Sequence, residues 1–313
     1  MRLLRSEFLR ARSRRVVPMV VIGGLIGIVI GLGIAGVYAH KPSAAEVATA
    51  QAQYQADYQR CLNGKFLGPS QLIDARYSSI EDVCRTAVTP ELNAIMLRDV
   101  EQILQHISTF VILLGALLGA SLAGADWTSS TMGTLLTWEP RRVRVFLIRA
   151  LVVAVVVVAV TLFLQIAFAL VYWLVTAVRG VTSFLPPHLL GATLGTMLRV
   201  SAMGVAFALV AYVLAMIGRS TVSSLGVLFG YLILFEGVIA GFRPSIVGSL
   251  FVRAAVVVIS RTPILTEPHG FSGPGIPEPI VLMDVTKAWV VVAIYVLVLG
   301  AISLVQFQRR DVT

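Results

Sequence analysis

The chain has 313 residues, of which 57% are hydrophobic and only 13% are charged, and its formal net charge is +9. A soluble domain carries about 25% charged residues, so this composition excludes an ordinary water-soluble protein and indicates that the lipid bilayer is the solvent. The basic residues flank long apolar runs without interleaved aromatic residues, which argues against nucleic-acid binding and favours contact with anionic lipid headgroups.

The first 15 residues, MRLLRSEFLRARSRR, place apolar side chains on one helical side among six arginines. This pattern is typical of an amphipathic helix on the cytoplasmic membrane surface, and Glu7, Phe8 and Arg12 are its candidate contact residues. A cluster of charges that only sets the topology is equally compatible with the pattern. The next apolar run, 16–38, is too long for the core of a signal peptide, so cleavage is not expected.

Six apolar runs have the length and composition of membrane-spanning helices. The predicted spans are 16–38, 107–125, 145–178, 200–217, 222–241 and 288–307. The connecting segments are 39–106, 126–144, 179–199, 218–221 and 242–287, and the tail is 308–313. Because Arg199 interrupts the fourth run, the part at 189–198 is predicted to be a separate partial or surface helix. The predicted fold is therefore an all-α polytopic membrane protein.

The distribution of arginines places both termini in the cytoplasm, together with 126–144 and 218–221. The long segment 39–106 is then extracellular, and Ser43 and Glu46 form a possible capping box at the start of a helix within it. Cys61 and Cys84 both lie in this segment. A pair of cysteines in an oxidising compartment predicts a disulfide, although two unpaired thiols are the alternative.

The sequence contains none of the residue groups that an enzyme of the common classes requires. It has no HExxH zinc motif, no GxSxG elbow and no Walker A motif, and its four histidines are scattered. Charged residues within the spans are candidate functional residues, which singles out Glu236 and Arg199. Glu236 is a candidate gate residue, a substrate contact or a partner of Arg199 or Arg243, and a purely structural hydrogen-bond acceptor is as compatible. Arg199 could instead reach the membrane surface.

Several of these patterns together resemble the ABC-2-type permeases, the membrane subunits of one class of ATP-binding-cassette exporter, in particular those of actinobacteria. The start of the chain, 5–13, resembles their N-terminal surface helix. The run ADWTSSTMGTLLTWEPRRVRV resembles the segment after their second span, with Asp126 and Ser130 in place of the usual Glu and Gly. The Arg219-Ser220-Thr221 turn and Glu236 also fit the family.

The resemblance implies that 126–144 forms a coupling helix that docks on a separate ATPase subunit. Residues assigned to this coupling are Asp126, Thr131, Glu139, Pro140, Arg141 and Arg142. Asp126 is expected to cap the N-terminus of that helix and Pro140 to end it, while the arginines pair with lipid phosphates or with acids of the ATPase. The segment 245–260 resembles the short re-entrant helices that precede the last span in this family.

These features predict a permease subunit of an exporter in the bacterial cell membrane, moving an amphipathic drug, antibiotic or lipid-like compound. Its partners are two ATPase subunits, which bind ATP and magnesium, a second permease copy or a homologous permease, and membrane lipid. This chain itself is expected to bind no cofactor and no metal. A glycolipid or polysaccharide exporter, and a membrane sensor or scaffold that transports nothing, remain the alternatives.

Overall fold

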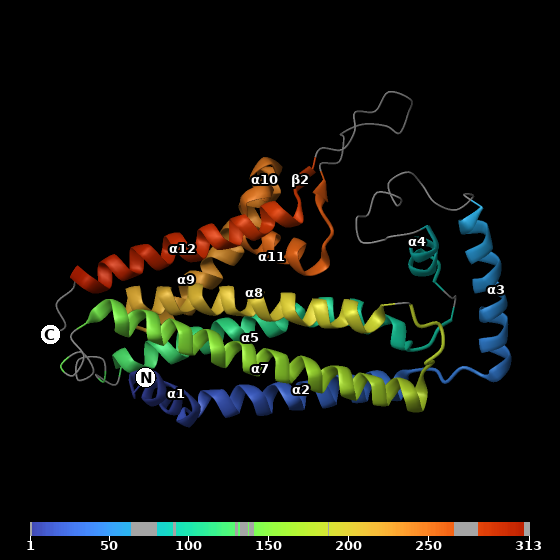
Figure 1. Ribbon diagram of the computed structural model, residues 1–313, viewed down its shortest axis with the longest axis horizontal. Helices are drawn as coiled ribbons and strands as arrows, with labels where there is room; N and C mark the ends of the chain where they lie inside the picture. Colours follow the sequence, from blue (N-terminus) through green and yellow to red (C-terminus); the bar gives the residue numbers. More distant parts are fainter. Residues whose placement is uncertain are drawn as a thin grey trace. The chain divides into compact units, whose positions relative to one another are not determined.

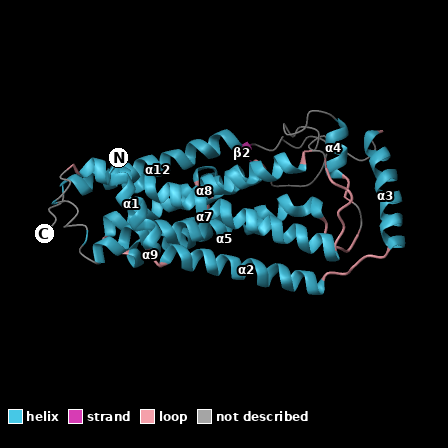
Figure 2. Ribbon diagram, turned by 60° about the horizontal axis from the view of Figure 1, so that its bottom comes forward, coloured by secondary structure: helices cyan, strands magenta, loops and turns pink. Residues whose placement is uncertain are grey.

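The computed structural model describes residues 2–63, 80–89, 92–128, 131, 137, 141–186, 188–265 and 281–309. Helices make up nearly all of this part of the chain (Figure 1 and Figure 2). The elements in chain order are α1 (Arg2–Ser13), α2 (Val16–Tyr38), α3 (Ala44–Leu62), α4 (Ile80–Ala87), η1 (Leu97–Asp99), α5 (Val100–Thr128), α7 (Arg142–Arg179), α8 (Leu189–Gly218), α9 (Thr221–Tyr231), η2 (Leu232–Ile239), α10 (Ala240–Phe242), η3 (Pro244–Ser249), α11 (Phe251–Ser260), β1 (Ile264–Leu265), β2 (Val281–Met283) and α12 (Val285–Arg309).

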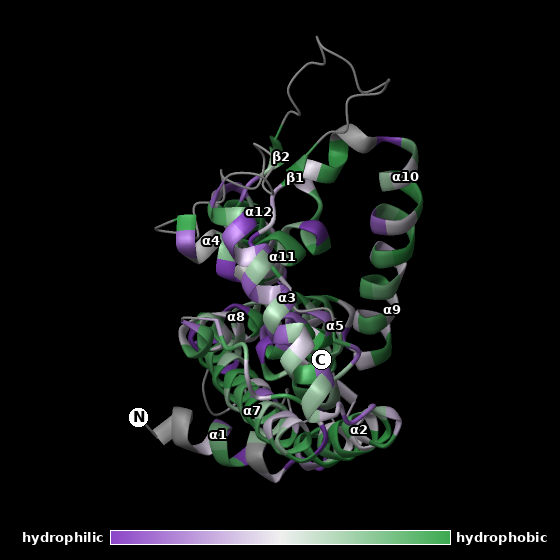
Figure 3. Cartoon of the chain, turned by 90° about the vertical axis from the view of Figure 1, so that its right-hand side faces the viewer, coloured by the Kyte–Doolittle hydropathy of each residue, from purple (hydrophilic) through white to green (hydrophobic). Residues whose placement is uncertain are grey.

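Six helices are long and apolar enough to cross a membrane, which confirms the predicted polytopic helical class. They are Val16–Tyr38, Leu97–Thr128, Arg142–Arg179, Leu189–Gly218, Thr221–Phe242 and Val285–Arg309. Hydrophobic residues line α7 and α9, as Figure 3 shows. Helices suit this composition because they satisfy every backbone hydrogen bond within one segment, as the hydrocarbon core requires. Which compartment each end faces stays a prediction.

The chain forms two compact units, which we describe separately. Unit 1 comprises Met1–Gly23, Gln105–Leu164 and Thr196–Thr313, and unit 2 comprises Gly24–Leu104 and Gln165–Gly195. The core of unit 1 lies where α5, α8, α11 and α12 meet, around buried residues such as Ala116, Phe207 and Val258. In the described part of the chain, the only strands are β1 and β2, which pair antiparallel between α11 and α12.

Helices α5 and α8 approach each other closely because glycines face the contact. A Cβ on Gly115 would lie 2.8 Å from the carbonyl oxygen of Gly204, and one on Gly119 would overlap the carbonyl oxygen of Ala208. Small residues at such contacts allow helix backbones to pack tightly in a membrane, where no hydrophobic force drives helices together. The glycines of α5 therefore set the spacing of the central pair of helices.

Helix α8 is one continuous helix from Leu189 to Gly218, which differs from the separate segments predicted on either side of Arg199. The guanidinium of Arg199 donates to the carbonyl oxygen of Ile259 at 3.3 Å and to the hydroxyl of Thr196 at 2.7 Å. Because these protein groups accept two of its hydrogen bonds, a guanidinium is tolerated at this position within a continuous helix.

The fifth span contains a π-helical stretch that the sequence did not predict. Helix α9 continues directly into η2, which is a π-helix, and then into the short α10. Such wide turns are uncommon and often occur at functional sites. Glu236 lies within this stretch.

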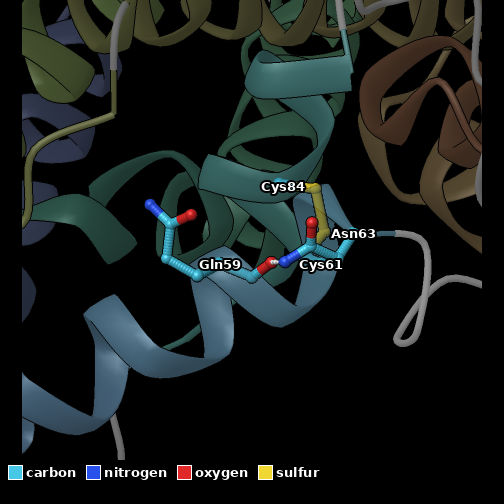
Figure 4. The surroundings of a disulfide bond; sticks show 4 residues. All are labelled: Gln59, Cys61, Asn63 and Cys84. Carbon is cyan, nitrogen blue, oxygen red and sulfur yellow. Dashed lines mark hydrogen bonds between the residues drawn. A yellow bond between two sulfur atoms is a disulfide. The ribbon is translucent and has the colours of Figure 1, made fainter.

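Unit 2 contains α3 and α4, which are joined by a disulfide. Ser43 and Glu46 form the predicted capping box at the start of α3. Cys61 and Cys84 are bonded, which confirms the predicted pairing, and both are fully buried (Figure 4). Val88 packs against the disulfide. The disulfide thus joins two helices that share only a small buried cluster.

A second contact within unit 2 holds the chain before α5 against the end of α7. The hydroxyl of Tyr172 donates to the carbonyl oxygen of Met96 at 2.7 Å. The backbone of Val181 donates to Ile95 at 2.9 Å and accepts from Leu97 at 3.1 Å. These bonds fix the segment that leads into the second span.

The substitution Gly119→Ala is expected to lower the midpoint of thermal unfolding, because the added methyl group must push α5 and α8 apart, at a cost of about 1–3 kcal/mol. Gly226→Ala is the matched control, since a Cβ at Gly226 meets no heavy atom within 4 Å. Fluorescence-detected size-exclusion chromatography of heated detergent samples measures both midpoints. Equal midpoints for Gly119→Ala and the unmodified protein would contradict the close helix contact.

The denatured but unreduced protein is expected to bind no maleimide-linked polymer, since its two cysteines are paired. Reduction should expose two sites, visible as a shift on a gel. Replacing both cysteines by serine should destabilise the α3–α4 pair by about 3 kcal/mol, because the disulfide closes a loop with a sequence separation of 23. Limited proteolysis measures this loss, and a gel shift without reductant would refute the pairing.

Candidate functional site

Helix α1 carries one buried carboxylate. Glu7 has only 6% of its surface exposed, and its two oxygens have different partners. Its Oε1 accepts a hydrogen bond from Nη1 of Arg10 at 3.3 Å, and its Oε2 accepts one from Nε of Arg149 at 3.1 Å. Arg149 lies near the start of α7 and is itself 5% exposed. The charge pair therefore joins α1 to a membrane-spanning helix.

Asp126, near the end of α5, is the centre of the same cluster and is 2% exposed. Arg14 forms an ion pair with its Oδ1 and Arg149 forms another with its Oδ2. Arg14 also donates to the carbonyl oxygen of Ser121 at 3.4 Å, and the hydroxyl of Thr131 donates to Oδ1 of Asp126 at 3.2 Å. One carboxylate thus connects the end of α1, the end of α5 and the start of α7.

Glu7, Arg14, Asp126 and Arg149, termed here the charge cluster, hold two negative and two positive charges. Burying an ion without a partner costs several kcal/mol, and these four groups offset that cost for one another. The cavity between them measures about 20 Å³, which accommodates a single water molecule. The charge cluster is therefore too tight to bind a substrate, and its physical effect is to fix the positions of three helices.

Aromatic side chains extend from the charge cluster across unit 1. Tyr212 of α8 lines the same small cavity, and its ring lies 5.4 Å from that of Phe146. The ring of Phe307 lies 6.2 Å from Phe146 and 6.4 Å from Trp127, and the guanidinium of Arg219 lies 5.0 Å from the Trp127 ring centre. Helices α5, α7, α8 and α12 are thereby joined beside the ends that flank 129–140.

The two charged residues singled out within the spans both hold α11. Oε1 of Glu236 accepts from the backbone N–H of Val252 at 2.6 Å and from the hydroxyl of Tyr231 at 3.2 Å. The partners predicted for Glu236, Arg199 or Arg243, are thus not the ones it bonds. Arg199 instead binds the carbonyl oxygen of Ile259 at the other end of α11. A carboxylate at the N-terminus and a guanidinium at the C-terminus both suit the helix dipole.

The coupling residues predicted from the resemblance are only partly described. Glu139 and Pro140 lie outside the described residues. Asp126 is not the N-cap that was predicted, because α5 continues through it to Thr128. Arg142 donates to the carbonyl oxygens of Phe307 and Gln308 at 3.3 and 3.1 Å. It thereby binds carbonyl groups at the C-terminal end of α12, whereas Arg141 is exposed.

Of the three residues predicted to make contacts from α1, Glu7 is the one that the structure brings into the charge cluster. Phe8 is 42% exposed, and the side chain of Arg12 lies outside the described part of the chain. Neither Arg14 nor Arg149 was predicted from the sequence to be a site residue. The signal that points to them is topological, because residues 14, 126 and 149 all adjoin ends of spans predicted on one side of the membrane.

In the part of the chain that the structure describes, no group of three or more histidine, cysteine or acidic residues could hold a metal ion. Comparison with family models, with curated proteins and with solved structures found no match in any of the three.

The substitution Asp126→Asn is expected to destabilise the protein by about 3–5 kcal/mol, because it leaves the buried Arg149 and the partly buried Arg14 with too little negative charge. The thermal midpoint in detergent measures this effect. Asp57→Asn is the matched control, since Asp57 pairs with Arg60 at the surface, where such pairs contribute less than about 1 kcal/mol. Similar losses in the two variants would contradict the central role of Asp126.

Proposed function

We propose that this protein is the permease subunit of an ATP-binding-cassette exporter of the ABC-2 type in the bacterial cell membrane. Two independent features support the proposal. The segments 5–13 and 126–144 resemble the surface helix and the coupling segment of that family. The six apolar helices also match the number of spans expected of such a subunit.

The observation that carries the proposal is the charge cluster. A permease without its own nucleotide site must receive mechanical work from a partner through rigid contacts. Asp126 and Arg149 lie on the helices that enter and leave the segment 129–140, and Arg14 and Glu7 attach α1 to both. A partner that pushes on this segment would move α1, α5 and α7 together, because separating the buried charges is costly.

In this mechanism, the partner supplies the chemistry. Two ATPase subunits bind ATP and magnesium, and the closure of the ATPase pair moves the coupling segments of two permease copies. Each permease then opens its path to the opposite side of the membrane. The charges of the cluster are paired with one another inside the protein. This suits a rigid connection that passes movement between helices better than a binding site for substrate.

An amphipathic drug, antibiotic or lipid-like compound is the proposed substrate. The described spans are dominated by apolar residues, which suits an apolar path. Oε1 of Glu236 and the guanidinium of Arg199 both bond the backbone of α11, so each of these charged side chains has a structural contact within the protein. A glycolipid or polysaccharide exporter would pass movement from the ATPase through the charge cluster in the same way. A sensor or scaffold would not need an ATPase.

Arg141→Glu is expected to reduce compound-stimulated ATP hydrolysis several-fold in proteoliposomes that hold the permease and its ATPase. The exposed guanidinium at Arg141 is proposed to contact acidic groups of the partner, and reversing its charge would repel them. Arg142 is a less suitable test position, because its side chain also binds the end of α12.

Arg179→Glu is the matched control, since Arg179 is an exposed arginine at the opposite end of α7 and should leave hydrolysis unchanged. Membrane insertion of both variants is checked by protease accessibility. Unaltered stimulation in Arg141→Glu would count against docking at this residue. Failure of the protein to co-purify with any ATPase would favour a sensor or scaffold.

A further inference from the structure

Unit 2 contains a pocket of about 330 Å³ that the proposed transport cycle does not use. It lies between α3, α4 and the segment that precedes α8. Its lining residues are Gln51, Tyr54, Gln55, Tyr58, Arg85, Phe184 and Leu185. Ligand pockets usually measure about 300–1,000 Å³, so this one suits a ligand of one or two small rings and is too small for a whole lipid.

Two tyrosines of α3 line one side of the pocket. Tyr54 and Tyr58 are four residues apart on α3, so their side chains share one face of the helix. Their rings are nearly parallel, with an interplanar angle of 10° and centroids 6.3 Å apart. Both rings also pack against the buried cluster of Cys61, Cys84 and Val88. The disulfide cluster thus supports both tyrosines, and part of each side chain remains accessible.

Phe184 lines the pocket from the segment that precedes α8. Its ring lies 5.5 Å from that of Tyr54, with an interplanar angle of 65°. The backbone at Phe184 has a φ of 66°, which is an unfavourable conformation for a bulky aromatic residue. Strained residues of this kind concentrate at ligand-binding sites, because the arrangement of a side chain there outweighs the local cost.

Polar groups at the pocket suit a ligand that both donates and accepts hydrogen bonds. Gln51 and Gln55 are exposed, and each amide offers both donors and an acceptor. Arg85 directly follows Cys84, and the nearby hydroxyl of Tyr58 raises the pKa of its guanidinium. The disulfide therefore also determines where this guanidinium lies.

The charges near the pocket disfavour both cationic and anionic ligands. The guanidinium of Arg85 would repel a quaternary ammonium group, although aromatic residues often bind such cations. Glu81, one turn before Arg85 on α4, offsets the positive charge and so weakens the attraction for an anion. A neutral ring with several hydroxyl groups fits the remaining requirements.

We propose that this pocket binds a neutral saccharide. The C–H groups of the sugar ring would pack against the aromatic side chains that line the pocket, and Gln51, Gln55 and Arg85 would bond its hydroxyl groups. The proposal does not depend on the export function, because an exporter and a sensor could each carry a sugar-binding outer domain.

The test uses the full chain in phospholipid nanodiscs, since many detergents carry sugar headgroups that would compete. Saturation-transfer NMR and calorimetry are applied with glucose, galactose, mannose, N-acetylglucosamine and their disaccharides. We expect saturable binding of at least one of these sugars, with a dissociation constant of about 1 mM or tighter. The double substitution Gln51→Ala/Gln55→Ala should weaken binding roughly tenfold, because it removes two hydrogen-bonding side chains.

Gln53→Ala is the matched control, because Gln53 is exposed on the same helix without lining the pocket, and alanine favours helix at all three positions. Equal affinities of this control and the double variant would overturn the proposal. So would the absence of saturable sugar binding, or a preference for choline or glucuronate over every neutral sugar. If the double variant loses sugar binding but still stimulates the ATPase normally, the sugar site and the export function are separate properties of the protein.

Discussion

A carboxylate buried at the end of a membrane-spanning helix requires positive partners, and the arrangement around Asp126 follows from that requirement. Arg14 and Arg149 both reach this one side chain, and Arg149 also binds Glu7. An amphipathic helix such as α1 could otherwise lie anywhere on a membrane surface, because lipid satisfies its apolar side without selecting a position. The charge cluster selects one position, since only there are all four charges compensated.

Charged side chains also hold a second part of unit 1 in place, around α11. This helix is only ten residues long, and most of its residues are buried in the core formed with α8 and α12. At each end of the helix one backbone group without a partner in the helix is bonded from a neighbouring helix, the N–H of Val252 by Glu236 and the carbonyl oxygen of Ile259 by Arg199. Each side chain has the sign of charge that the helix dipole favours at that end. Charges that look like transport residues in the sequence therefore also have a structural role.

Within unit 2, the pair of α3 and α4 is held by different means, because both helices are partly polar and share only a small buried cluster. The disulfide replaces the large apolar core that such a small arrangement lacks. By fixing α4 beside α3, it also places Arg85 near two tyrosines of the other helix. Stability and the shape of the pocket thus have a common origin in one covalent bond.

The sequence alone determined the class of the protein, the six spans and the disulfide, because these depend on local composition. An apolar run of sufficient length must be helical in a bilayer, and a capping box such as that of Ser43 and Glu46 acts within one turn. Only the tertiary structure decided which charges meet. Arg14, Asp126 and Arg149 are far apart in the chain, and Arg199 appeared to interrupt α8 until its partner on α11 was known. The physical reason is that the cost of burying a charge depends on neighbours that come from other helices, and a single sequence does not specify which helices become neighbours.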